Sequence, residues 1–322
     1  MNASNEFSIF ENWQYPLSEL KSHSYLLKWR YIYMSCLSVA STFGIPGNIM
    51  VIFSILHFKH LRKVPHILLC NLAIFDFGVM VMNVLSLYGA IYGNNAFNYL
   101  FCELSGSLCM LSCFGSLWSI LAVSVNRYIC ICHNALYRSV FDAKTTVLMA
   151  ASVWAVAIAL DTPNMKFFGY ASHSFSIALH CAIKTQNDWW YNVFFYTGLA
   201  FLLPVFVTAW CYYCIWKAAT KMSKNYNEQR RKENRQMTLS LIIIFCVFLI
   251  TWTPQCILLL LVGVQPSLYV PFELIICFEM WAHANSAINF MVYGFTHSGF
   301  RLAYRTIAGW FLPFLKSSNV KE

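Results

Sequence analysis

Residues 66–91 read HILLCNLAIFDFGVMVMNVLSLYGAI, and this stretch carries a single charged side chain, Asp76. About 20 apolar residues in a helix are enough to cross the hydrocarbon core of a bilayer. The stretch is therefore long enough to span a membrane. Because a carboxylate is costly to bury there, Asp76 is a candidate functional residue.

Six further apolar runs accompany this one along the chain. They cover residues 32–57, 101–130, 145–163, 189–217, 236–262 and 271–296. Of the 322 residues, 59% are hydrophobic and only 11% are charged, whereas soluble domains average about 25% charged residues. Seven runs with polar loops between them predict an all-α membrane protein, a bundle of seven transmembrane helices without a separate soluble domain.

The distribution of basic residues predicts how this bundle is oriented. We expect an extracellular N-terminal tail over 1–31, the seven-transmembrane domain over 32–296 and a short cytoplasmic tail over 297–322. Seventeen of the 22 Lys and Arg residues lie on the side of the membrane that holds the C-terminal tail. The positive-inside rule places that side in the cytoplasm. Ser298–Phe314 reads as an amphipathic helix lying along the inner leaflet.

Other functional classes find little support in the sequence. No internal repeat is visible, which argues against an inverted-repeat transporter. A channel or proton relay needs a path of charged side chains, whereas only Asp76 and Glu279 are acids deep within the runs. No phosphate loop, HExxH motif or assembled nucleophile, base or metal set is present, so we do not expect an enzyme. We expect no nucleic-acid partner.

Polar residues of the seventh run could join Asp76 inside the bundle. Asn285, Ser286 and Asn289 lie within two helical turns of one another. A carboxylate surrounded by hydroxyl and amide groups offers the oxygen ligands that a hard cation such as sodium prefers. The same residues could equally form a hydrogen-bonded interhelical cluster without an ion. The sequence leaves both interpretations open.

The third run has informative residues at both ends. Cys102 opens it, and Cys181 lies in the loop between the fourth and fifth runs; both face the oxidising side, where they form a disulfide or remain two thiols. Asn126, Arg127 and Tyr128 close it at the cytoplasmic side. An Arg at such a helix end is commonly only a snorkelling anchor.

The sixth and seventh runs carry two further local signals. Pro254 removes a backbone hydrogen bond and is expected to kink the sixth helix beside Trp252 and Phe248. Glu279 and His283 are four residues apart and therefore share one face of the seventh helix. They form either a private pair or polar groups for a cationic or amide-bearing ligand.

Taken together, these residues resemble a rhodopsin-like (class A) G-protein-coupled receptor over essentially the whole chain. Each match is weak alone, but their order and spacing are specific. The matching positions are Gly47, Asn48, Asn71, Asp76, Cys102, Arg127, Trp154, Pro204, Tyr212, Phe248, Trp252, Pro254, Asn285, Ser286, Asn289 and Tyr293.

Within that class the chain is similar to melatonin receptors. The stretch Asn126–His133 matches their Asn-Arg-Tyr motif and the Cys-His segment that follows. Cys102–Leu108 matches their third span, and Asn289–Gly294 matches their seventh. The scaffold resembles this family better than the ligand-contacting positions do, since Thr185, Ile183, Ala200, Cys256 and Phe290 each differ from the family's residue.

The resemblance implies a ligand site in the extracellular half of the bundle. Cys109 stands where amine receptors carry Asp, and His283 stands where photopigments carry Lys, so neither an aminergic receptor nor an opsin is expected. The implied ligand-contacting residues are Asn164, Gln186, Cys109, Met110, Cys113, Trp252, Cys256, Glu279 and His283.

The resemblance also implies partners and an activation mechanism. A small extracellular ligand, melatonin or a related indoleamide, activates a heterotrimeric G protein of the inhibitory class. The alternative is an orphan or peptide receptor with a non-indole ligand. Sodium at Asp76 and Ser116, within a cluster with Asn285, Ser286 and Asn289, would favour the inactive state. Activation involves Asn126, Arg127, Tyr128, Tyr212, Phe248, Pro254 and Tyr293.

Three lesser expectations complete the picture. The protein is a multi-pass plasma-membrane protein in contact with lipid. Asn2 lies in an Asn-Ala-Ser glycosylation acceptor. Ser317 and Ser318 are the only hydroxyl residues of the tail beyond the amphipathic helix, so arrestin recruitment is expected to be weak.

Overall fold

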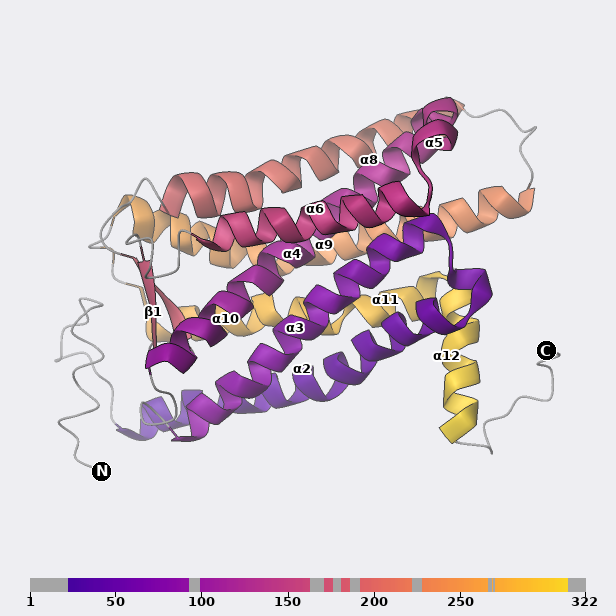
Figure 1. Cartoon of the computed structure of the whole chain (residues 1–322). Helices are drawn as coiled ribbons and strands as arrows, with labels where there is room; N and C mark the ends of the chain where they lie inside the picture. The colour runs from indigo at the N-terminus through magenta and orange to yellow at the C-terminus, as the bar shows by residue number, and fades with distance from the viewer. Residues whose placement is uncertain are drawn as a thin grey trace.

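The structure, a computed structural model, describes residues 23–92, 99–162, 171–175, 181–185, 192–221, 228–265, 268 and 270–311. Long helices run side by side along one axis (Figure 1). The start of the first described helix, at His23, marks what we call the N-terminal end of the bundle, and the last described helix, Ser298–Phe311, marks the C-terminal end. The first six spanning segments are α2 (His23–His57), α3 (Val64–Tyr92), α4 (Tyr99–Cys132), α6 (Ala143–Asp161), η7 (Asn192–Leu202) continuing as α8 (Leu203–Lys221), and α9 (Glu228–Val264).

The seventh segment is helical but interrupted. It consists of α10 (Phe272–Ala284), a single 3-10 turn η8 (Asn285–Ala287) and α11 (Asn289–Thr296). Six other helices among the described residues are each long and apolar enough to cross a membrane. Together they confirm the predicted bundle of seven transmembrane helices.

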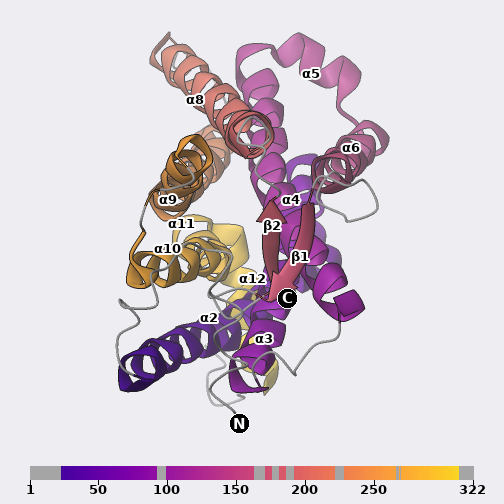
Figure 2. The same cartoon turned by 90° about the vertical axis from the view of Figure 1, so that its left-hand side faces the viewer.

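Two elements extend what the sequence predicts. Helix α2 begins at His23, inside the segment expected as tail, and Trp29 packs there against a buried cluster that includes Tyr33 and Leu37. A two-stranded antiparallel hairpin, β1 (Ala171–Phe175) and β2 (Cys181–Thr185), adds strands to a fold expected to be all helix. The hairpin lies across the N-terminal end of the bundle, as Figure 2 shows.

The Arg30 side chain links the N-terminal part of α2 to the C-terminal end of α3. Its Nη2 donates to the carbonyl of Ile91 at 2.8 Å, and its Nε donates to the carbonyl of Ala90. The last carbonyls of a helix have no partner within the helix, and a cation there also complements the helix dipole. Arg30 therefore caps α3 from a neighbouring helix, a role its sequence position does not reveal.

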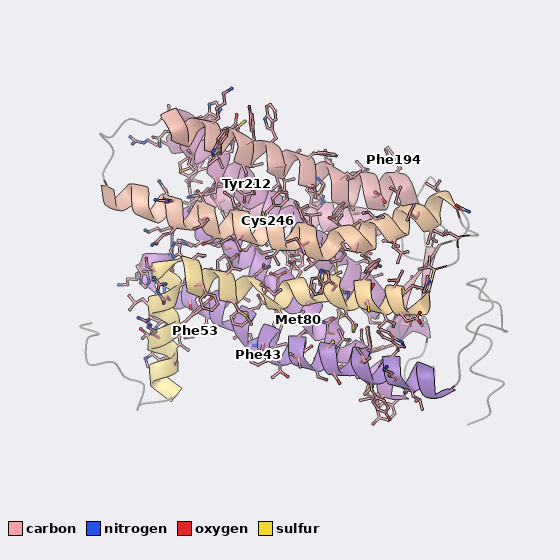
Figure 3. The ribbon with its side chains drawn as sticks, turned by 180° about the vertical axis from the view of Figure 1, so that it is seen from behind. Phe43, Phe53, Met80, Phe194, Tyr212 and Cys246 are labelled. Atoms are coloured by element: carbon pink, nitrogen blue, oxygen red, sulfur yellow. The ribbon has the colours of Figure 1, made fainter. Side chains whose placement is uncertain are left out.

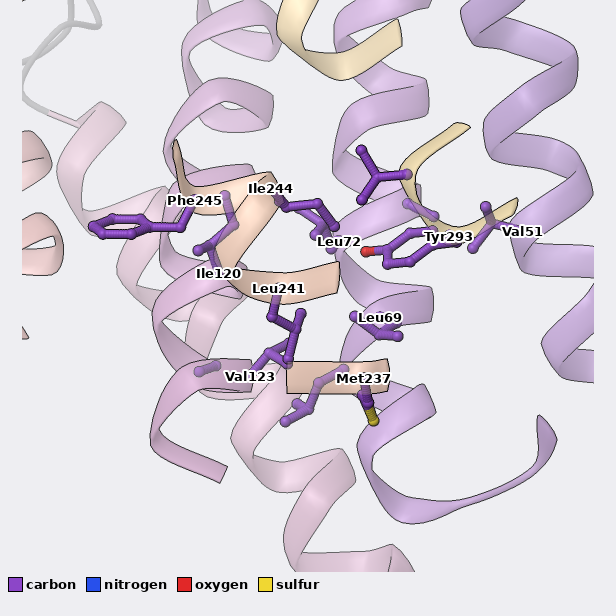
Figure 4. Packing of buried hydrophobic residues seen from close by; sticks show 14 of the residues in the cluster. Val51, Leu69, Leu72, Ile120, Val123, Met237, Leu241, Ile244, Phe245 and Tyr293 are labelled. Atoms are coloured by element: carbon purple, nitrogen blue, oxygen red, sulfur yellow. The ribbon is translucent and has the colours of Figure 1, made fainter. Parts of the chain in front are cut away.

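The largest buried cluster fills the half of the bundle toward the C-terminal end. It joins side chains of α2, α3, α4, α9 and α11, including Val51, Leu72, Ile120, Ile244 and Tyr293 (Figure 4). Outward faces carry large apolar side chains instead of charges. Phe43 is 55% exposed and Phe194 is 57% exposed (Figure 3). A surface of this kind suits lipid, because the hydrocarbon core offers no hydrogen bonds to polar groups.

The fifth spanning segment changes helix type at a proline. Residues Asn192–Leu202 form a π-helix, and α8 follows from Leu203 with ordinary α geometry. Pro204 lacks a backbone N–H and cannot donate to the carbonyl four residues earlier. The change of hydrogen-bonding pattern therefore falls at the residue that cannot support a continuous α-helix.

A short helix closes the C-terminal end of the bundle. Helix α12 (Ser298–Phe311) turns away from α11 and lies across the bundle axis (Figure 1). Its Trp310 packs edge-on against Phe53 and His57 of α2, with ring centroids 6.0 and 5.4 Å apart. This contact fixes α12 beside the first spanning helix.

The large Phe290 ring is accommodated by the glycine opposite. A Cβ atom placed on Gly47 would overlap the Phe290 ring. The ring thus lies against the bare backbone of α2, and nearby the Asn48 amide donates to the carbonyl of Ser286 at 2.9 Å. Gly47 permits this close approach of α2 to the seventh segment.

We therefore expect Gly47→Ala to destabilise the bundle, because overpacking a filled core costs about 1–3 kcal/mol. The thermal denaturation midpoint of the purified protein should fall. Phe290→Ala in the same chain should restore part of the loss by removing the overlapping ring. Gly294→Ala is the matched control, since its Cβ would lie 3.2 Å from Tyr304 and should cost less. An unchanged midpoint for Gly47→Ala would contradict this packing.

Candidate functional site

A carboxylate in the middle of the bundle gathers three donors from two other segments. Asp76 Oδ1 accepts hydrogen bonds from Ser116 Oγ at 2.8 Å and from Ser286 Oγ at 2.9 Å. Asp76 Oδ2 accepts from Asn289 Nδ2 at 2.6 Å. All four residues are buried, and we call them the Asp76 cluster. They join α3, α4 and the interrupted seventh segment.

Asn285 does not join this cluster, although the sequence predicts it there. Neither its amide nitrogen nor its amide oxygen has a hydrogen-bond partner in the described part of the structure. Asn285 opens the 3-10 turn η8, whose tighter winding changes the direction of successive side chains relative to an α-helix. Ser286 and Asn289 therefore bond to Asp76, whereas Asn285 makes no side-chain hydrogen bond among the described residues.

Another buried amide, that of Asn71, links α3, α4 and α6. Its Nδ2 donates to Ser119 Oγ at 2.8 Å, and its Oδ1 accepts from Trp154 Nε1 at 2.9 Å. The Trp154 ring also lies 4.2 Å from that of Phe75. These two hydrogen bonds give both ends of the buried Asn71 amide a partner. The residue therefore stabilises the contacts among the three helices.

Nearer the N-terminal end lies a second group of polar side chains. Glu279 Oε1 lies 3.2 Å from His283 Nε2, and Glu279 Oε2 accepts from Gln255 Nε2 at 3.2 Å. His283 Nε2 also lies 3.9 Å from Cys109 Sγ. With Cys113, these residues form what we call the Glu279 cluster, which joins α4, α9 and α10.

Gln255 is a member of this cluster that the sequence analysis missed. The resemblance directs attention to Cys256, two residues after Pro254, because melatonin receptors carry an amide there. Here an amide lies one residue earlier and reaches Glu279 across the helix interface. The sequence feature that points to Gln255 is its polar side chain inside an apolar run, directly before Cys256.

The remaining predicted ligand-contacting residues lie in different surroundings. Trp252 stacks on Phe248, with centroids 5.8 Å apart, and packs beside Cys109 and Cys113. Met110 packs against Phe114 in a separate cluster, so the third-span candidates face two directions. Cys256 is partly buried against the main core. Asn164, Gln186 and the glycosylation candidate Asn2 lie outside the described residues.

Cys102 is disulfide-bonded, and eleven other cysteines of the chain remain thiols. Cys181, the expected partner, is the first residue of β2, and its side chain lies outside the described residues. A covalent link at Cys102 anchors the N-terminal end of α4. It lies at the end of the bundle that the hairpin covers (Figure 2).

At the opposite end of α4, Arg127 is buried without an acidic partner among the described residues. It is 2% exposed, and its Nη2 donates to Asn126 Oδ1 at 3.1 Å. Tyr137 of the short helix α5 (Asn134–Val140) lies close by. Burial raises the pKa of Tyr137 above its ordinary value, and the Arg127 charge opposes that rise. Tyr128 faces away and contacts His133, its hydroxyl 2.9 Å from Nε2.

Two tyrosines lie between Arg127 and the Asp76 cluster. The Tyr212 hydroxyl lies 2.8 Å from Ser124 Oγ and so links α8 to α4. The Tyr293 ring stacks on Phe300 with centroids 5.2 Å apart, and its buried hydroxyl has no hydrogen-bond partner in the described ranges. Both residues are buried side chains at helix interfaces.

The part of the chain from α2 to α11, which carries these clusters, matches a known family. A family model described as 7 transmembrane receptor (rhodopsin family) matches residues 47–293. The chain belongs to this family. It is therefore a G-protein-coupled receptor, not an enzyme, and a multi-pass protein of the plasma membrane whose partners are a small ligand and a G protein.

Individual proteins support the same placement. The chain is 27% identical to melatonin receptor type 1B-B of Danio rerio over 278 residues, which cover 84% of this chain and 79% of that one. It is 29% identical to melatonin receptor type 1B of Mus musculus over 269 residues, covering 81% and 73%. These matches confirm the relation to melatonin receptors.

A solved structure supports the fold. The crystal structure of squid rhodopsin matches with a TM-score of 0.77 and 20% sequence identity, covering 90% of this chain and 89% of that one. At this identity the match concerns the arrangement of the helices alone.

The surroundings of Arg127 predict how basal signalling responds to a charge. We expect Asn126→Asp to lower ligand-independent signalling, because the new carboxylate would form a charge-assisted bond with Arg127 and hold it inside the receptor. The measurement is basal G-protein activation at matched surface expression. Asn134→Asp makes the same change at an exposed position of α5 and should have little effect. Equal basal signals in Asn126→Asp and the parent would refute the expectation.

Proposed function

We propose that this receptor detects a small indoleamide, melatonin or a close relative, and inhibits adenylate cyclase through an inhibitory G protein. The supporting observation is the relation to melatonin receptors over more than four fifths of the chain. The buried Glu279 cluster combines polar groups with the neighbouring Trp252 ring, a combination found in small-molecule sites.

We propose further that the N-terminus is extracellular and the C-terminus cytoplasmic. Basic side chains such as Lys59, Arg62, Arg138 and Arg301 gather at the end of the bundle that holds η3 (Lys59–Leu61), α5 and α12 (Figure 1). The positive-inside rule assigns that end to the cytoplasm. The Glu279 cluster then lies in the extracellular half, and α12 lies along the inner leaflet in contact with lipid.

A second candidate is a receptor on the same scaffold with a non-indole ligand, including a peptide. It is favoured by the Glu279–His283 pair with Gln255, since these side chains would suit a cationic or amide-bearing group. Melatonin itself carries one amide and no charge. The two candidates therefore differ in whether Glu279 faces a charged ligand.

Cells that express the receptor should separate these candidates. We expect saturable inhibition of forskolin-stimulated cyclic AMP by melatonin or N-acetylserotonin, with serotonin weaker, and loss of the response in Asn164→Ala. Surface expression of both forms is measured in parallel. No response to these three compounds from a receptor at the surface would reject the indoleamide ligand and leave the family assignment intact.

We also propose that the Asp76 cluster holds a sodium ion, which favours the inactive state. The donor set suits it, because a carboxylate and two hydroxyl groups are the oxygen ligands that hard cations prefer. The Asn289 amide oxygen, buried and without a hydrogen-bond partner in the described part of the chain, is a further oxygen beside Asp76. Asp76, Ser116, Ser286 and Asn289 are the residues that would hold the ion.

Sodium binding should be visible as stabilisation of the purified receptor. We expect a higher denaturation midpoint in sodium chloride than in choline chloride at equal ionic strength, because a ligand that binds the folded state stabilises it. Asp76→Asn should abolish the difference, whereas Asp142→Asn, an exposed cap of α6, should keep it. Equal midpoints of the parent in both salts would show a hydrogen-bonded cluster without an ion.

A further inference from the structure

The Glu279 cluster contains two pairs of side chains that face each other across the bundle. Cys109 and Cys113 are four residues apart on α4, and Glu279 and His283 are four residues apart on α10. Residues with this spacing lie on one face of a helix. One ligand atom from each of Cys109, Cys113 and His283 lies within 4.8 Å of the other two.

We propose that these side chains form a zinc site, with Cys109, Cys113 and His283 as ligands and Glu279 as the fourth. Two sulfurs, one imidazole and one carboxylate make a four-ligand set of the kind that binds Zn²⁺ tetrahedrally. Sulfur and imidazole ligands favour zinc over the hard cations that bind carboxylates and hydroxyls. The site is distinct from the Asp76 cluster, whose donors are all oxygen or amide.

The spacing of the donor atoms is close to what a zinc ion requires. Zn–S bonds of about 2.3 Å and Zn–N bonds of about 2.0–2.1 Å, at a tetrahedral angle, put sulfur and nitrogen about 3.5 Å apart. Cys109 Sγ and His283 Nε2 lie 3.9 Å apart. The same geometry puts nitrogen and oxygen about 3.3 Å apart. His283 Nε2 and Glu279 Oε1 lie 3.2 Å apart. Glu279 lies outside the group of three residues whose ligand atoms are all within 4.8 Å of one another, so its carboxylate has to move by about 1 Å or more toward the cysteines to complete the site.

Gln255 orients the fourth ligand. Its amide donates to Glu279 Oε2 and leaves Oε1 on the side of His283. Hydrogen bonds of this kind to a ligating carboxylate tune metal affinity. The proposed site thus involves three helices, with ligands from α4 and α10 and a supporting amide from α9.

Zinc binding at this site exchanges protons for the metal ion. Each cysteine releases its thiol proton to solvent as the Zn–S bond forms, and His283 binds as the neutral imidazole. No oxidant or reductant takes part. All four ligands are buried, with exposed fractions of 3% to 9%, so the metal replaces protons in an enclosed environment.

The depth of the site indicates the route of entry. Cys109 is ten residues from the start of α4 and His283 is eleven from the start of α10, which correspond to about 15–16 Å at 1.5 Å per residue. Both starts lie at the end of the bundle covered by the hairpin (Figure 2). Zinc would therefore enter from that end and fasten α4 to α10.

The test uses the purified full chain in detergent under a thiol reductant, after removal of metals with EDTA. Cobalt(II) serves as the spectroscopic probe for zinc, because thiolate ligands give it charge-transfer absorption and tetrahedral geometry intensifies its visible bands. Zinc should displace the cobalt and raise the denaturation midpoint, and EDTA should reverse both effects. These measurements need neither an agonist nor a G protein, so they are independent of the proposed indoleamide function.

Single-ligand variants decide between this site and the other thiols of the chain. Cys109→Ser, Cys113→Ser and His283→Ala should each weaken cobalt and zinc binding at least tenfold, the lower limit of what loss of even an outer partner costs. Cys277→Ser removes a partly exposed thiol elsewhere on α10 and should bind as the parent does. Gln255→Leu, which keeps every ligand, should weaken binding about tenfold.

The proposal is overturned if the parent shows no saturable cobalt absorption, or if all three ligand variants bind as tightly as the parent. Midpoints measured without metal establish that each variant is folded. If Cys109→Ser fails to fold, Cys113→Ser and His283→Ala carry the same test. Loss of binding in Cys277→Ser alone would place the metal at another thiol and reject this site.

Discussion

A carboxylate inside a membrane needs hydrogen-bond donors, and Asp76 obtains three of them from α4 and the seventh segment. Leaving a buried charge without partners would cost far more than any single packing contact. The positions of Ser116, Ser286 and Asn289 are therefore constrained together. Because Asn289 begins α11 and Ser286 lies in η8, the interruption of the seventh segment is part of how the carboxylate is satisfied.

The seventh segment connects the two polar clusters. Glu279 and His283 lie on α10, which precedes the 3-10 turn. Ser286 lies within the turn, and Asn289 follows it. A ligand or ion that changes the position of α10 acts on the start of this seventh segment. The same segment continues through η8 to Tyr293 and then to α12. Such coupling shifts a conformational equilibrium only as far as the bound species prefers one state over the other.

The sequence predicted local features well and contacts between distant segments poorly. Apolar length identified every spanning helix, and the four-residue spacing placed Glu279 beside His283 because both depend on a single helix. The Gln255 bond to Glu279 and the fit of Phe290 on Gly47 join segments 24 and more than 200 residues apart, so no local pattern contains them. The 3-10 turn at Asn285, which makes no side-chain hydrogen bond to Asp76 among the described residues, likewise has no local sequence signal. The hairpin forms where no apolar periodicity guides a prediction.

The π-helix before Pro204 has more residues along a given length of its axis than an α-helix has. Each of its hydrogen bonds closes one residue later than in an α-helix, so the stretch contains more residues for the distance it covers. Sequence alignments that count residues back from Pro204 can then slip by one position. Ala200 lies within this π-helix, so its place around the helix axis differs from the one that a count of α-helical residues back from Pro204 gives.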